Sequence, residues 1–120
     1  MKKFLFSLVF LIVISSLSCI AQEKNDKNIS IKRYLVERDF PDGLVIPTNE
    51  KGCQIVNGVV SNNIEEHVTW VHSYVTSDKK KTFCIYDAPS PEAIRRVAEK
   101  NGLPVNKITE VTVLDPYFYN

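Results

Sequence analysis

The sequence lacks the features that identify most nucleic-acid-binding proteins and many enzymes. Its 120 residues carry 15 Lys plus Arg against 14 Asp plus Glu, a formal net charge of +1. Without a basic surplus the chain has no electrostatic basis for collecting nucleic acid. It also has no nucleophile elbow, no phosphate-binding glycine loop and no dense cluster of metal-ligating residues. The remaining information lies in runs of β-branched and aromatic residues.

A hydrophobic run long enough to span a membrane is also missing, but a shorter one opens the chain. The N-terminus is basic, residues 4–17 are almost wholly apolar, and small residues follow up to Ala21. This run is shorter than the ~20 residues that a membrane-spanning helix needs, and the order is typical of a secretory signal peptide. We therefore predict a signal peptide over residues 1–21, a polar tether over 22–30, and an exported protein, periplasmic or secreted, without a stable transmembrane anchor.

Cysteine is scarce, with three in the chain. Cys19 lies in an imperfect lipoprotein box, because Ser16 stands where a larger aliphatic residue is usual. A lipoprotein anchored at Cys19 is therefore the alternative to simple cleavage. In an exported protein Cys53 and Cys84 can form a disulfide, but nothing in the sequence brings them within bridging distance. A buried pair of free thiols is the favoured alternative.

The periodicity of the apolar residues predicts four strands and two helices. They are a strand over 31–40, a helix capped by Thr48 and running to about Asn63, hairpin strands over 70–75 and 82–89, a helix opened by Ser90 and closed by Gly102, and a last strand over 107–114. In one domain (residues 31–120) this βαββαβ order predicts a ferredoxin-like α+β fold, with both helices on one face of an antiparallel sheet. A bare sheet face exposes much apolar surface, so we expect a homodimer.

The hairpin concentrates side chains that can do chemistry. Because side chains alternate along a strand, Trp70, His72 and Tyr74 are expected on one face. The lysines of the turn, residues 79–81, are expected to be solvated and to protect the sheet edge. A histidine, a thiol and phenols thus lie close together in the sequence, which makes a site plausible without naming its chemistry.

Our candidate metal site consists of His72 and Cys84 from the hairpin and Glu37 from the strand over 31–40. Imidazole, thiolate and carboxylate groups are all ligands of divalent transition metals. The hairpin register decides whether they meet. Pairing residue 72 with 84 places His72 and Cys84 on one face, whereas pairing His72 with Ile85 puts Cys84 beside Ser73 on the opposite face. The sequence leaves both registers open.

Several collinear segments of the chain resemble one bacterial family. They are residues 33–38, 70–75, 82–93, 101–104 and 108–111. Over residues 33–119 the chain is similar to a family of small ferredoxin-like proteins, long catalogued as a domain of unknown function, that includes a nickel-binding protein. The resemblance implies a dimeric α/β-barrel and, as cofactor, nickel or another divalent transition metal.

Three functions are compatible with these observations. We rank a non-catalytic, exported, metal-binding homodimer first. A cell-envelope binding or interaction module without metal comes second. A cofactor-poor small-molecule enzyme, monooxygenase- or isomerase-like, comes third. It would use a pocket between sheet and helices, with His72 and Glu37 as an acid/base pair. Only fold analogy supports that enzyme, so no catalytic residue is assigned.

Overall fold

The computed structural model describes residues 28–119. The predicted signal peptide, Cys19 and most of the predicted tether lie outside the described residues. Within them, no helix is both long enough and apolar enough to cross a membrane.

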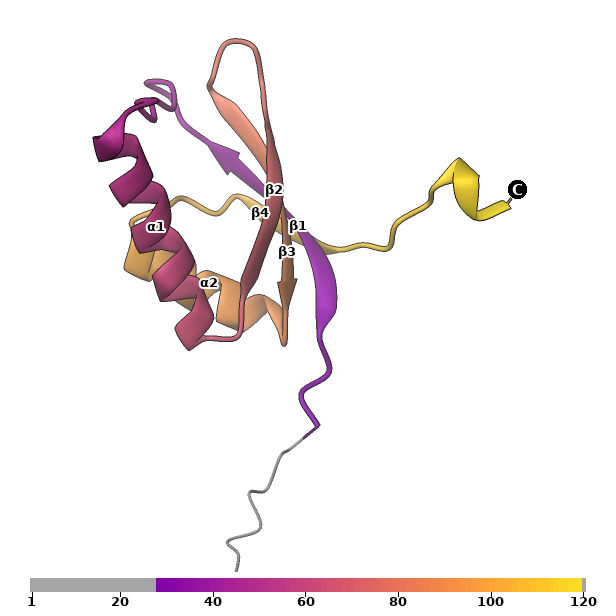
Figure 1. The fold of residues 1–120 in the computed structure, drawn as a ribbon. Helices are drawn as coiled ribbons and strands as arrows, with labels where there is room; N and C mark the ends of the chain where they lie inside the picture. The colour runs from indigo at the N-terminus through magenta and orange to yellow at the C-terminus, as the bar shows by residue number, and fades with distance from the viewer. Residues whose placement is uncertain (1–27, 120) are drawn as a thin grey trace, which may run out of the picture.

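The described residues form a four-stranded antiparallel sheet with two helices packed on one of its faces (Figure 1). The elements are β1 (Lys32–Asp39), α1 (Glu50–Glu65), β2 (Thr69–Val75), β3 (Lys81–Ala88), α2 (Pro91–Asn101), β4 (Lys107–Glu110) and a final 3-10 helix (Pro116–Tyr119). The strand order is β2-β3-β1-β4. Both the α+β class and the ferredoxin-like arrangement predicted from the sequence are confirmed.

The core lies between the sheet and the helices, and it follows from alternation along the two central strands. β1 and β3 pair without interruption, with Val36 opposite Cys84 and Tyr34 opposite Tyr86. Alternate residues of both strands are buried against the helices, whereas their neighbours are half-buried on the other face. We call that other face the uncovered face, because no helix of the described residues packs on it. The contrast in burial separates two surfaces on which a site can form.

Helix α2 begins and ends as its local sequence predicts. The Ser90 hydroxyl accepts a hydrogen bond from the Ala93 N–H at 3.2 Å, and Pro91 occupies the first turn. Gly102 ends the helix with a left-handed φ of 67°. Ile94 and Val97 are fully buried, so this helix anchors the helical layer to the sheet.

Helix α1 differs from the prediction at its N-terminus and is only loosely packed. The cap is Asn49 rather than Thr48, since the Asn49 carboxamide oxygen accepts a hydrogen bond from the Gly52 N–H at 3.2 Å. Only Gly52 and Asn63 are buried in this helix, while several of its apolar side chains are exposed. Helix α1 therefore covers the sheet beneath it incompletely.

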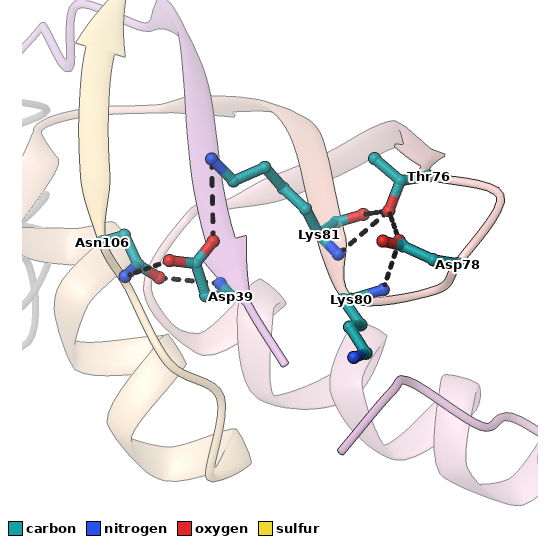
Figure 2. Close-up of polar contacts among 6 residues, drawn as sticks. All are labelled: Asp39, Thr76, Asp78, Lys80, Lys81 and Asn106. Atoms are coloured by element: carbon teal, nitrogen blue, oxygen red, sulfur yellow. Dashed lines mark hydrogen bonds and ion pairs between the residues drawn. The ribbon is translucent and has the colours of Figure 1, made fainter. Parts of the chain in front are cut away.

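The turn between β2 and β3 is held by polar contacts rather than by apolar packing (Figure 2). The Asp78 carboxylate accepts hydrogen bonds from the Thr76 hydroxyl at 2.7 Å and from the Lys80 N–H at 3.0 Å. Lys79 adopts a left-handed φ of 61°. The Lys81 ammonium lies 3.7 Å from Asp39 at the end of β1. The turn is exposed to solvent, as its lysines predict.

Strand β4 is shorter than predicted, ending at Glu110 instead of residue 114. Glu110 already pairs with Tyr34, so β1 has only a few residues left to pair with a longer strand. One more backbone hydrogen bond follows, from the Val111 N–H to the Arg33 carbonyl at 2.9 Å. Beyond it the chain leaves the sheet and extends away from the body (Figure 1).

Candidate functional site

A β-bulge in β2 determines which residues of the hairpin share a face. Trp70 pairs with Tyr86, but His72 pairs with Ile85, so Val71 is an extra residue without a partner. Trp70 consequently packs toward the core, and its indole N–H donates to the Ser73 hydroxyl at 2.9 Å. The prediction that Trp70 shares a face with His72 is wrong, because the bulge interrupts the alternation.

The same register separates two of the three candidate metal ligands. Ser73 pairs with Cys84, and Cys84 is 6% exposed beneath the helices. His72, paired with Ile85, is exposed on the uncovered face. Of the two registers that the sequence allows, the protein adopts the one that places His72 and Cys84 on opposite faces. One chain cannot direct both side chains at the same ion.

Glu37 shares the uncovered face with His72 but does not adjoin it. Glu37 pairs with Phe83 on one side and Lys107 on the other, whereas His72 belongs to the row of Ile85. The two donors are two strand spacings apart, roughly 10 Å, before the offset along the strands is added. Among residues 28–119, no three His, Cys, Asp or Glu side chains cluster closely enough to hold a metal ion.

The surroundings of His72 form a shallow depression on the uncovered face. The Tyr74 ring meets the imidazole edge-on, with ring centroids 5.1 Å apart and an interplanar angle of 87°. The other lining residues come from β1, β3 and the segment after β4, namely Arg33, Leu35, Ile85 and residues 111–113. The sequence did not indicate residues 111–113, because their place depends on where β4 ends.

An ion pair lies at one end of this face. The Arg33 guanidinium donates two hydrogen bonds to the Asp87 carboxylate, at 2.7 and 2.9 Å. These hydrogen bonds hold the pKa of Asp87 below its ordinary value. Asp87 is therefore already engaged across the β1–β3 pair, in addition to its place before the turn into α2.

No disulfide joins Cys53 and Cys84, in agreement with the favoured alternative of free thiols. Both cysteines are free, Cys84 in the core and Cys53 exposed on α1. Cys53 also differs from the expected buried thiol. Its place in the apolar spacing of the helix predicted burial, but α1 packs loosely and leaves it in solvent.

The helix-covered side of the sheet contains a cavity of about 220 Å³. Neither His72 nor Glu37 lines it, so the acid/base pair considered above lies outside the sheet–helix pocket. Its polar residue of most interest is Arg38, which is 2% exposed. Arg38 alternates in phase with the buried residues Tyr34 and Val36, so the sequence itself indicates that it faces the core.

The fold and the uncovered face together define a small ferredoxin-like α+β domain with an exposed imidazole on its open sheet. The family described as "Nickel responsive protein SCO4226-like" matches residues 34–111. That match spans more than half of the chain, and the chain belongs to this family.

A solved structure shows the same fold. The crystal structure of SCO4226 from Streptomyces coelicolor A3(2) is similar with a TM-score of 0.55 at 20% sequence identity, over 69% of this chain and 99% of that chain. No curated protein matches the chain. The resemblance seen in the sequence is thereby confirmed, and the link to nickel comes from the family description.

Proposed function

We propose that this chain is an exported, non-catalytic homodimer that binds nickel or another divalent transition metal through His72. The family description supplies the metal, because it names nickel responsiveness. The exposed position of His72 on the uncovered face supplies the donor. Imidazole suits nickel and its neighbours in the first transition row.

The position of His72 is the observation that carries the proposal. The imidazole lies among apolar side chains of the uncovered face, with Leu35 and Ile85 half-buried and Tyr74 63% exposed. Such a surface favours contact with another apolar face. A second copy of the chain has an identical apolar face and can therefore pack against the first.

The donors of one chain fall short of a complete metal site. Cys84 lies on the helix-covered side of the sheet, so it is not among the proposed ligands. Glu37 lies on the uncovered face with His72 and remains a candidate oxygen donor. Because residues 28–119 contain no cluster of three donors, the proposed site needs ligands from the second copy. The exposed aromatic segment that includes Tyr117 and Phe118 is available to reach that copy.

Calorimetric titration of Ni²⁺, Zn²⁺, Co²⁺ and Cu²⁺ into the purified protein tests the proposal. We expect stoichiometric uptake that His72→Ala weakens by at least tenfold. His67→Ala is the matched control, since His67 lies after α1 and outside the proposed face. Unchanged affinity in His72→Ala would exclude His72 as a ligand. No heat with any ion would leave the interaction module as the better hypothesis.

Export is a separate part of the proposal and rests on the N-terminal sequence alone. Intact-mass measurement of the protein recovered outside the cytoplasm should give a chain that begins at Gln22. A lipid-modified chain beginning at Cys19 would replace the secreted or periplasmic form by an anchored one.

A further inference from the structure

The cavity between the sheet and α1 has the properties of a small-molecule site. Its volume is about 220 Å³, whereas about 150 Å³ suffices to hold benzene in an apolar core. The walls are mostly apolar and come from α1, from the loop before it, and from β1, β2 and β3. They include Leu44, Ile55, Val56, Val59 and Trp70. Val45 and Ile46 in that loop are exposed, which places the mouth beside α1.

A buried cation, Arg38, lies in the wall of this cavity without an anionic partner among residues 28–119. The Arg38 guanidinium donates to the Pro104 carbonyl at 2.5 Å and to the Tyr86 hydroxyl at 3.3 Å. Both acceptors are neutral, and the Arg38 Nε–H has no partner among the described residues. No described carboxylate lies within ion-pairing distance of Arg38.

Burying a charge without a partner costs free energy, so a buried charge in a protein is normally paired with an opposite charge. A bound ligand of opposite charge can provide that pair. The neighbouring groups do not supply the missing anion. Burial raises the pKa of Tyr86, which keeps the phenol neutral, and the Cys84 and Thr82 side chains hydrogen-bond to each other at 3.4 Å. A planar guanidinium with free N–H donors is the preferred partner of a carboxylate.

We propose that this cavity binds a hydrophobic monocarboxylic acid, with the hydrocarbon part against α1 and the carboxylate paired with Arg38. The volume selects an aryl-alkyl or medium-chain acid somewhat larger than benzene. The site lies on the opposite side of the sheet from His72, so it does not depend on the proposed metal site.

Binding of 3-phenylpropionate, compared with its neutral isostere 3-phenylpropan-1-ol, tests the proposal. Both probes have the same apolar body, so any difference between them reports on the charged group. By calorimetry or ¹⁵N NMR titration of the purified protein, we expect the acid to bind about tenfold tighter or more, because hydrogen bonds to charged groups are the stronger ones. Equal affinities, or no binding of the acid, would overturn the proposal.

Two kinds of variant complete the test. Arg38→Met should abolish the preference for the acid. Because this substitution also removes the contacts to Pro104 and Tyr86, a second variant leaves Arg38 intact. Val59→Phe fills the cavity from α1 and should remove binding of the acid, whereas Val60→Phe, on the same helix but outside the cavity lining, should preserve it. Retention of full affinity in Val59→Phe would overturn the proposal.

Discussion

His67 adopts a conformation that suits glycine better than histidine. It follows the C-cap of α1 with a φ of 56°, and its N–H donates to the Ile64 carbonyl at 3.1 Å. Glycine tolerates this left-handed geometry without the steric cost of a Cβ. We predict that His67→Gly raises the free energy of unfolding by about 1 kcal/mol, measured by urea denaturation. His67→Ala retains a Cβ, and an equal gain in that variant would contradict the explanation.

The carboxylate of Asp87 should make part of the stability depend on pH. Hydrogen bonds from Arg33 lower its pKa from the ordinary 3.8, so its stabilising contribution is present above that value and is lost as the pH falls through the lower folded-state pKa. We predict that the urea midpoint of the wild-type protein falls more between pH 6 and pH 3 than that of Asp87→Asn. Parallel decreases in the two proteins would show that other carboxylates cause the effect.

Arg38 and His72 show what a sequence reveals about single residues. His72 is identifiable as a donor from its residue type, but its exposure and its face depend on the register of the hairpin, in which it pairs with Ile85. Arg38 is identifiable as core-facing by its phase with Tyr34 and Val36. That no carboxylate of the described residues lies beside it, however, is a property of the packed tertiary structure. The residue type predicts which ligand or ion a side chain can bind. Long-range packing determines whether neighbouring side chains provide the other groups that a binding site needs.

Two glycines in α1 play different roles although both lie inside the helix. A Cβ added at Gly52 would lie 1.6 Å from the Pro47 carbonyl oxygen, whereas one at Gly58 meets nothing within 4 Å. Gly52 therefore allows the chain before the helix to pass close to its first turn. Gly58 only lowers helix propensity.

We predict that Gly58→Ala stabilises the protein by about 0.5–1 kcal/mol and that Gly52→Ala destabilises it by about 1–3 kcal/mol. Thermal and urea unfolding of the two variants measure both changes. Because the substitution and the helix are the same, the comparison isolates the contact with Pro47. Stabilisation by both substitutions would show that the close approach has no energetic consequence.

The elements predicted best are those whose limits are set by neighbouring residues. Helix α2 lies between its predicted caps, Ser90 and Gly102, because both capping groups are local in the sequence. Strand β4 was predicted too long, since its end depends on how many residues of β1 remain to pair. The N-terminus of α1 was misplaced by one residue, because Thr48 and Asn49 are both good caps and only the approach of the chain selects between them.

At the scale of the whole molecule, the uncovered face should control association. Tyr74 is 63% exposed on that face, so a charge there should hardly affect the folded monomer. We predict that Tyr74→Asp shifts the proposed homodimer to monomer in sedimentation velocity. Ile64→Asp provides a matched control, since Ile64 is 67% exposed on α1, away from the uncovered face. Loss of the dimer in Ile64→Asp but not in Tyr74→Asp would place the interface on the helical side.

The bulge at Val71 has a consequence for changes in chain length. Trp70 pairs with Tyr86 and His72 with Ile85, which are consecutive positions of β3. Deletion of Val71 would therefore leave every other pair of the ladder in place, and β2 would become a regular strand. Insertion of one residue elsewhere in β2 would instead rotate all the following side chains to the other face. This strand can therefore lose a residue at position 71 while keeping Trp70 in the core and His72 at the surface.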